Sequence, residues 1–380
     1  MKNLGVSILL LCAGCASADS DPKEAVDTML KSGEVTHLVF TADGKKLGVA
    51  NEFRFSFDFK REKCHGRLRS FSTSDWKLTG DTDELNVSDL KCASFANGDW
   101  IVIARKLDRF GRGNPFTQGV AFYEWDLAKI AGKEIDVIQQ GRDNIHFVPH
   151  AIANSSEKRL GAVWVECYPH GLPPVRLVFV LDLNAGKKTV ALEDIASGPA
   201  PSGLIFSTKI IEFSPEGKYI VSSQPGQPFQ IQLHATDTGK LVRSMKLESH
   251  ATAVSFSPNG KMLAVNCFDG TVLILKTDLT EKINTFKVQG HDNAQRILQA
   301  VTFAGDEHLA VVANYSRIEL FDTKEWKSIR TFEGGKDRVN CVTATPDGKL
   351  LAAGFGVTAS SPGRVRVFDV KTGKLVVELE

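Results

Sequence analysis

Short apolar runs alternate with turn-forming residues along most of this chain. The clearest stretch has apolar runs at 253–256 and 262–266, separated by Ser-Pro-Asn-Gly at 257–260. Pro fixes one backbone angle and Gly tolerates a positive φ, so this tetrapeptide predicts a tight turn between two strands. An Asp-Gly pair then leads to a third strand at 271–275, and a second turn leads to a fourth strand at 282–286. The pattern predicts a four-stranded antiparallel unit.

The same unit recurs. Phe-Ser-Pro-Glu-Gly-Lys at 213–218 returns as Phe-Ser-Pro-Asn-Gly-Lys at 256–261 and as Ala-Thr-Pro-Asp-Gly-Lys at 344–349, while 40–45 carries a related turn. A period of about 40 residues is typical of propellers, whose small sheets must stack on neighbours to bury both faces. First strands of seven units are expected near Val35, Cys92, His150, Ile210, Ala253, Ala300 and Asn340. We therefore predict an all-β fold, a seven-bladed β-propeller of four-stranded antiparallel blades over residues 27–380.

The third strands carry a second signature, a large apolar residue followed by Asp. It occurs at 120–126, 177–182, 317–322 and 364–369, and each Asp is expected to accept backbone N–H groups of the next turn. Trp125-Asp126 and Gly290-His291 are the literal pairs, and the chain here resembles the Trp-Asp (WD) repeat propeller family. The resemblance implies a non-catalytic scaffold that binds other proteins, and a structural role for His250 and His291.

Two segments compete to complete the last blade. Residues 27–30 could return to it from the N-terminus, whereas residues 375–379 read as that blade's own fourth strand. The sequence leaves both open.

Composition narrows the choice of partner. The chain has 46 Lys and Arg against 45 Asp and Glu, so no excess charge directs it to nucleic acid. No internal apolar stretch is long enough to cross a membrane. An apolar content of 42% suffices for a continuous core, and we expect a monomer.

The N-terminus reads as a targeting segment. Lys2 precedes the apolar run 4–11, which predicts a signal peptide over residues 1–18. A lipoprotein-type signal ending at Gly14 would make Cys15 the lipidated residue, and ordinary cleavage would fall before Asp19. We expect an exported protein of the periplasm or cell envelope, similar to bacterial exported or lipoprotein-type members of the family, with membrane contact only through such a lipid anchor.

Five further cysteines are spread over the repeats. Three of them, Cys92, Cys267 and Cys341, lie in expected strands and read as buried packing residues. Cys64 lies in an insertion and is the candidate for a disulfide with Cys92 or Cys167.

The search for chemistry finds no catalytic, cofactor or metal site. The chain has no nucleophile elbow, phosphate-binding loop or His-Glu-x-x-His motif. His146 and His150 are four residues apart, with His170 in the same unit, but strand geometry and Pro149 disfavour a shared metal. The alternative to a scaffold is an enzyme or a small-ligand-binding propeller that uses the central cavity.

Arginine and aromatic residues gather in the longer loops, and these residue types are enriched in protein-interaction hot spots. Loops after the second and fourth strands of each unit should share one rim. We predict one continuous protein-binding surface there, formed by Arg109, Arg112, Tyr168, His170 and Phe268. The identity of the partner does not follow from the sequence.

Overall fold

The computed structural model describes residues 34–54, 64–81, 85–94, 100–106, 118–123, 146–155, 160–168, 175–185, 187–193, 210–223, 229–288, 300–314, 316–335, 337–356 and 363–379. The regular structure of these residues is strand throughout. Within the same ranges, no helix has the length and apolar character needed to cross a membrane.

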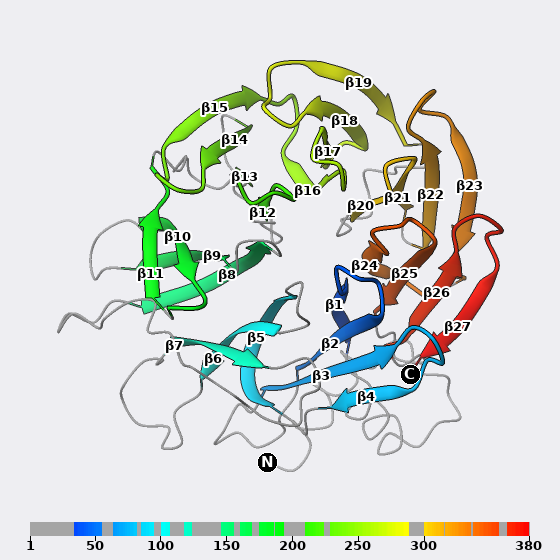
Figure 1. Ribbon diagram of the computed structural model, residues 1–380, viewed down its shortest axis with the longest axis horizontal. Helices are drawn as coiled ribbons and strands as arrows, with labels where there is room; N and C mark the ends of the chain where they lie inside the picture. The colour runs from blue at the N-terminus through cyan, green and yellow to red at the C-terminus, as the bar shows by residue number, and fades with distance from the viewer. Residues whose placement is uncertain are drawn as a thin grey trace, which may run out of the picture.

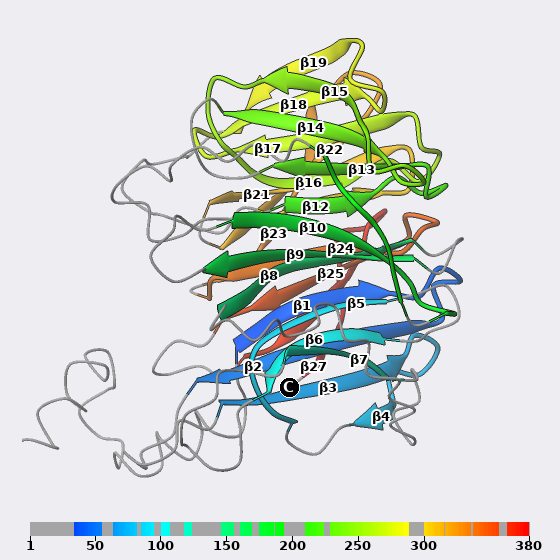
Figure 2. The ribbon, with the colours of Figure 1, turned by 90° about the vertical axis from the view of Figure 1, so that its left-hand side faces the viewer.

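The strands form six sheets arranged around a central axis (Figure 1). Figure 2, turned by 90°, shows that the strands run roughly along this axis. Five of the sheets have four strands, the first strand innermost. Three of the five contain β8 (His146–Ser155), β9 (Leu160–Tyr168), β10 (Val175–Asp182) and β11 (Lys187–Ala191); β12 (Ile210–Phe213), β13 (Tyr219–Ser223), β14 (Gln230–Ala235) and β15 (Leu241–Lys246); and β16 (Ala251–Phe256), β17 (Met262–Cys267), β18 (Thr271–Lys276) and β19 (Lys282–Lys287). The other two contain β20 (Val301–Ala304), β21 (His308–Asn314), β22 (Arg317–Asp322) and β23 (Ser328–Glu333); and β24 (Val339–Ala344), β25 (Leu350–Phe355), β26 (Val365–Asp369) and β27 (Leu375–Leu379).

The sixth sheet has seven strands and corrects the predicted blade number. It contains β1 (Glu34–Phe40), β2 (Lys46–Arg54), β3 (Cys64–Ser72), β4 (Leu78–Asp81), β5 (Leu85–Ser94), β6 (Trp100–Lys106) and β7 (Gln118–Tyr123). Strand β3 pairs with β4 through its C-terminal end, and its His65 and Gly66 pair with Asn86 and Leu85 of β5. The first two repeats are thereby joined into one sheet. The all-β propeller of four-stranded blades is confirmed, but the prediction of seven blades is wrong because there are six.

The ring closes between the first and last sheets. Strand β1 packs against β24 and β25, and Val35 shares a buried cluster with Val365, Val367 and Leu379. Strand β27 is the fourth strand of its own sheet, as the C-terminal alternative predicted, while residues 27–30 lie outside the described residues.

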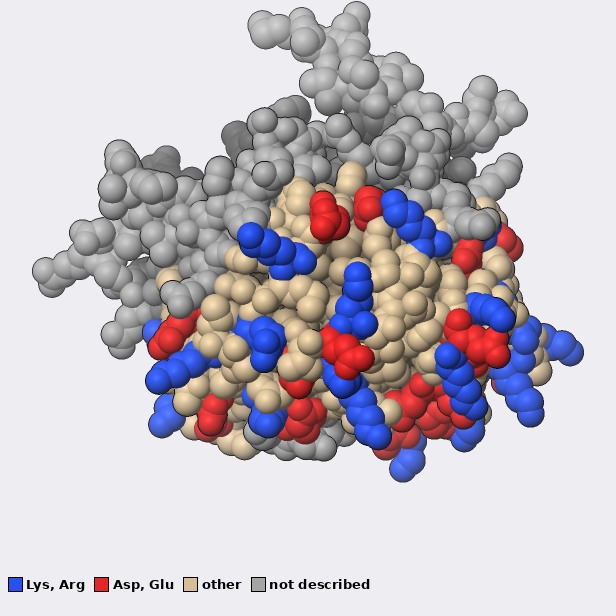
Figure 3. All heavy atoms as spheres, turned by 90° about the horizontal axis from the view of Figure 1, so that it is seen from above, with Lys and Arg blue, Asp and Glu red and all other residues tan. Residues whose placement is uncertain are grey.

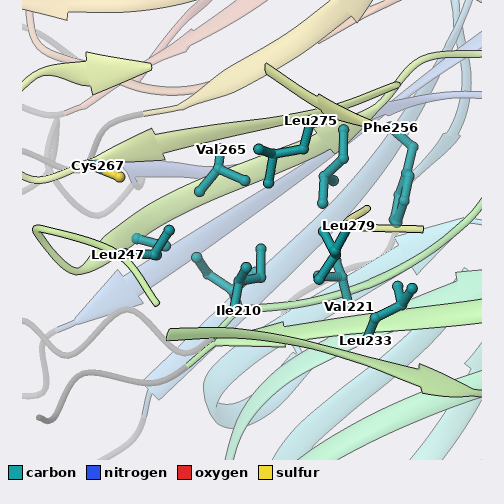
Figure 4. Close-up of a cluster of buried hydrophobic side chains, with 12 residues drawn as sticks. Ile210, Val221, Leu233, Leu247, Phe256, Val265, Cys267, Leu275 and Leu279 are labelled. Atoms are coloured by element: carbon teal, nitrogen blue, oxygen red, sulfur yellow. The ribbon is translucent and has the colours of Figure 1, made fainter. Parts of the chain in front are cut away.

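The core consists of apolar layers between neighbouring sheets. Figure 4 shows one layer, in which Ile210, Val221 and Leu233 face Val265 and Leu275 of the next sheet. Both faces of the inner strand β12 are used in this way. Ile211 and Phe213 of β12 belong to the layer on its other side, which demonstrates the stacking that the repeat predicted.

The predicted turns are confirmed. The Gly217, Gly260 and Gly348 N–H groups donate to the carbonyls of Ser214, Ser257 and Thr345 at 2.7–2.8 Å, and all three glycines have φ between 64° and 69°.

Two cysteines can be described. Cys267 is a buried free thiol, as predicted, whereas Cys341 is only partly buried and its thiol lies 3.9 Å from the Val35 carbonyl oxygen. The side chains of Cys64, Cys92 and Cys167 lie outside the described part of the structure, so a disulfide among them stays a prediction.

Candidate protein-interaction surface

The antiparallel order of the strands divides the loops between two rims. The turn rim holds the connections from first to second and from third to fourth strands, such as 257–261 and 323–327. The loop rim, at the opposite end, holds the connections from second to third strands and from one sheet to the next, such as 268–270 and 247–250. These two rims are the surfaces that the fold offers to a partner.

The charges of the turn rim are largely paired within their own turns. Lys349 lies 2.8 Å from Asp347, and Lys327 lies 2.7 Å from Glu325. Bonds from Lys349 and Thr345 lower the pKa of Asp347 to about 2. On the side of the molecule seen in Figure 3, the described Lys and Arg side chains are interspersed with Asp and Glu.

The aspartates that end the third strands also serve the turn rim. One carboxylate oxygen of Asp322 accepts the N–H groups of Lys324 and Glu325, each at 2.8 Å. Asp182 accepts two N–H groups at 2.9 Å in the same manner. The predicted role of this repeated Asp is confirmed at these positions and is structural.

Three rings gather on the loop rim, where the sheets of β12–β15 and β16–β19 meet. The His250 ring stacks on the Phe268 ring, with the ring centroids 4.6 Å apart and the planes at 23° to each other. The centroid of the Phe229 ring lies 5.8 Å from that of His250. His250 is 5% exposed, while the two phenylalanines are partly exposed. We call Phe229, His250 and Phe268 the aromatic cluster.

The electrostatics of the aromatic cluster favour a neutral imidazole. Burial lowers the pKa of His250, and the nearby Asp269 opposes this shift. Asp269 is held by the backbone N–H and the hydroxyl of Thr271 at 3.1 and 2.8 Å, and Lys287 lies 3.4 Å away. Although burial works against it, these contacts lower the pKa of Asp269. The cluster therefore presents apolar rings beside one paired charge.

Cys267, which precedes Phe268 in the chain, has an unreactive thiol. It is 2% exposed, and burial, together with Asp269, raises its pKa to about 12. A thiol of this kind stays protonated and is a poor nucleophile.

An arginine cluster occupies the loop rim of the last two sheets. The guanidinium of Arg366 lies over the Phe355 ring at 4.9 Å and donates to the Gly334 carbonyl at 2.8 Å. Arg364 and Arg366 both form ion pairs with Glu378. These interactions fix the arginines in place, so we assign them to packing between the last two sheets.

The structure places two of the predicted surface residues. Phe268 lies on the loop rim in the aromatic cluster, as expected, and Tyr168 ends β9 opposite His146 of β8. The side chains of Tyr168 and His146 lie outside the described residues, as do Arg109, Arg112 and His170 entirely. One continuous surface through all five residues stays a prediction.

The remaining site predictions concern metal and lipid. No group of metal-ligating side chains gathers among the described residues. His150 lies in β8, but its side chain is not described, and Cys15 and His291 lie outside the described ranges. The aromatic cluster is therefore the described feature that matches the predicted binding rim.

Sequence reasoning missed one polar position. Glu212 on β12, Ser255 on β16, Thr302 on β20 and Thr343 on β24 occupy the same register, because each pairs with a residue at an equivalent place in its second strand. An alignment of the repeats on their shared turn would have found it.

Comparisons with known proteins bear on the family. The model described as "WD domain, G-beta repeat" matches residues 326–369, and that of the "Anaphase-promoting complex subunit 4 WD40 domain" matches residues 229–305. A WD repeat-containing protein, SL1-17 of Schistosoma mansoni, is 25% identical over 149 residues. These matches support the WD40 repeat family. The bacterial exported or lipoprotein type finds no support in them, since that relative is eukaryotic.

The extent of these similarities limits what they show. The match to SL1-17 covers 39% of this chain and 46% of that protein, so the chain spans about half the length of the curated relative that it matches. Among solved structures, the β-propeller domain of Cps50 (Swd1) from Myceliophteria thermophila is similar, with a TM-score of 0.57 and 13% identity over 89% of this chain and 98% of that one. This likeness shows the fold. WD40 propellers are typically protein-interaction scaffolds and generally non-catalytic.

Proposed function

We propose that this protein is a non-catalytic scaffold whose protein partner binds the loop rim at the aromatic cluster. The observation that carries the proposal is the stack of His250 on a partly exposed Phe268, with Phe229 beside it. Rigid aromatic side chains offer a large contact area at small entropic cost, and they are enriched among interaction hot spots.

The contrast between the rims supports this choice. Charges on the turn rim are satisfied by neighbours in the same turns, as in the pairs of Asp347 with Lys349 and Glu325 with Lys327. A partner that docked there would have to compete with existing pairs. The aromatic cluster has apolar area to bury, and Asp269 beside it supplies one oriented charge.

Affinity capture with paired variants tests the proposal. Tagged wild-type protein and Phe268→Ala are compared by quantitative mass spectrometry, with Ile329→Ala as the control. Ile329 is 49% exposed on β23, an outer strand. Loss of an aromatic anchor typically costs ~2 kcal/mol or more, so Phe268→Ala should bind its specific partner at least about tenfold more weakly. Retention of all partners by Phe268→Ala, with unchanged melting temperatures, would contradict the proposal.

We also propose export of the mature protein, on the basis of the apolar run 4–11 behind Lys2. Cleavage before Cys15 gives a lipidated N-terminus, and cleavage before Asp19 gives a free one. Mass spectrometry of the mature N-terminus distinguishes the two, and a retained Met1 on an intracellular protein would refute export. Cys15→Ser should release a lipidated protein from the membrane fraction.

A further inference from the structure

The turn that carries Phe268 continues directly into a carboxylate, that of Asp269. The turn is tight, because the Gly270 N–H donates to the Cys267 carbonyl at 3.0 Å. The Phe268 N–H donates to the His250 carbonyl at 2.9 Å, which fastens the turn to the residue preceding β16. The ring of Phe268 and the carboxylate of Asp269 are therefore carried by one well-bonded turn of the loop rim.

The Asp269 carboxylate is held in one orientation and still has room for a further donor. One of its oxygens accepts the Thr271 N–H at 3.1 Å, and the other accepts the Thr271 hydroxyl at 2.8 Å. An ionised carboxylate offers about four acceptor positions, so about two remain. The Asp269 side chain is 36% exposed, and a donor from outside the protein can therefore reach it.

Lys287 of β19 is the described ion-pair partner of Asp269, and the pair is loose. The Lys287 ammonium lies 3.4 Å from the carboxylate oxygen, which is longer than a usual charged N–H···O bond, and the lysine side chain is 70% exposed. An ion pair between exposed side chains adds little stability, because water and salt screen it. A cation with better geometry could therefore displace Lys287 at small cost.

The charge of Asp269 acts on the aromatic cluster itself. Burial lowers the pKa of His250 and Asp269 opposes this shift, while burial raises the pKa of Cys267 and Asp269 adds to it. Because His250 stacks on Phe268 with ring centroids 4.6 Å apart, the carboxylate and the rings share one small area of the loop rim. The imidazole, with its pKa lowered, is mainly neutral at pH 7 and does not repel a cation.

We propose that the aromatic cluster and Asp269 together bind an arginine side chain of the partner protein. A guanidinium is planar and stacks on aromatic faces, and its N–H groups match the geometry of a carboxylate. Phe229 and Phe268 are both partly exposed and offer such faces. An ammonium is a compact point charge that cannot lie flat on a ring, so lysine fits less well. The inference rests on the proposed function, because it names the residue that a partner would place on the aromatic cluster.

Capped Leu-Arg-Leu, Leu-citrulline-Leu and Leu-Lys-Leu peptides test the choice of side chain. Each is titrated into the full-length protein, and NMR follows the ring signals of Phe268 and the carboxyl signal of Asp269. Citrulline has nearly the shape of arginine without its charge, so its peptide should bind about fivefold more weakly. The lysine peptide should also bind more weakly than the arginine peptide. Equal binding of the arginine and citrulline peptides, or unmoved Phe268 signals with all three, would overturn the proposal.

Two variants should change the affinity for Leu-Arg-Leu in opposite directions. Asp269→Asn keeps an acceptor for the Thr271 N–H but removes the charge, and it should weaken binding about fivefold. Lys287→Met frees the carboxylate and should strengthen binding about twofold. A merely structural role of Asp269 gives no reason for the gain, so weaker binding by Lys287→Met would count against the site.

The turn rim supplies matched controls. Asp278 accepts the N–H and the hydroxyl of Thr280 in a similar way, and Lys276 pairs with Glu281. Asp278→Asn and Lys276→Met should therefore leave the binding of Leu-Arg-Leu unchanged. An equal loss in Asp269→Asn and Asp278→Asn would reveal a general effect of net charge and would overturn the proposed site.

Affinity capture separates this inference from the scaffold proposal. If Phe268→Ala loses the specific partner while Asp269→Asn retains it at full strength, the scaffold proposal stands and the arginine site is overturned. If Phe268→Ala retains every partner, the scaffold proposal fails, and the peptide titrations still report whether the loop rim prefers arginine. Loss of the same partner by both variants, with unchanged melting temperatures, supports both proposals.

Discussion

The side-chain amide of Asn340 donates a hydrogen bond to the carbonyl of Val35, 3.2 Å away and 305 positions earlier in the chain. Asn340 is 9% exposed and Val35 is fully buried. Arg338 in turn donates to the Asn340 side-chain oxygen at 2.7 Å, which fixes the amide. This bond joins the first sheet to the last.

Asn340→Ala should therefore weaken the ring at its closure. Removal of the donor leaves the buried Val35 carbonyl with the weaker Cys341 thiol, 3.9 Å away, and should cost about 1 kcal/mol in the free energy of unfolding. Urea denaturation measures the cost, and hydrogen exchange should accelerate in β1 and β24. Thr252→Ala, which removes a buried bond within one sheet, is the control. Equal exchange in the two variants would show that Asn340 has no special part in closure.

At position 326, a glycine variant should be more stable than an alanine variant, which is the reverse of the usual order. Its φ is 55°, a region costly for any side chain, and its ring stacks on Phe286 of the preceding sheet at 6.3 Å. Trp326→Gly loses the packing but relieves the strain, whereas Trp326→Ala loses the packing and keeps the strain. We expect the Gly variant to be more stable than the Ala variant by about 1 kcal/mol, the reverse of the usual order. Denaturant unfolding of both variants measures this difference, and a more stable Ala variant would show that the backbone relaxes.

Two glycines that hold the same position in separate Asp-Gly-Lys turns should differ in their tolerance of substitution by alanine. Gly44 and Gly348 both have φ of 69°. A Cβ on Gly44 would meet Thr345 at 3.8 Å, an ordinary contact, but on Gly348 it would lie 2.7 Å from the Ala304 carbonyl oxygen. Gly44→Ala should cost about 1–2 kcal/mol for the backbone alone, and Gly348→Ala about 1–3 kcal/mol more. Equal midpoints in thermal unfolding would contradict the predicted clash.

The stability of the protein should depend on pH through Glu212. Its folded-state pKa of about 7 lies above the ordinary value of 4.5, so the folded state binds the proton more tightly. The contribution of Glu212 to the free energy of unfolding is therefore greatest below about pH 4.5 and is lost as the pH rises through 7. Glu212→Gln should match wild type at pH 4.5 and exceed it at pH 8, in urea titrations. A constant difference across this range would show that Glu212 is not desolvated.

Local features of this fold could be predicted from the sequence. The Ser-Pro-x-Gly turns and the Asp at the ends of third strands depend on backbone angles and short-range hydrogen bonds, which residue type largely determines. The position of Phe268 on the loop rim followed from the antiparallel order of the strands, while its role in binding stays a prediction. These predictions needed no knowledge of distant contacts.

What could not be predicted depends on tertiary contacts. The joining of β3 to β5 changes the number of blades, yet it involves only two residue pairs at His65 and Gly66. In the turns between third and fourth strands, Gly239 and Gly373 have positive φ. Leu279 and Trp326 hold the same position with positive φ in two other sheets, where their side chains pack in the apolar layers between sheets. The desolvation that raises the pKa of Glu212 likewise requires the packed ring.

The order of strands also has a consequence for biosynthesis. Each sheet is built from strands that are consecutive in the chain, and β27 completes the last sheet without help from the other end. During translation every sheet can therefore finish as soon as its own residues have left the ribosome. Only the apolar side of β1 must wait, uncovered, until β24 and β25 have been synthesised. The interval between these two events is when the nascent protein most needs protection from aggregation.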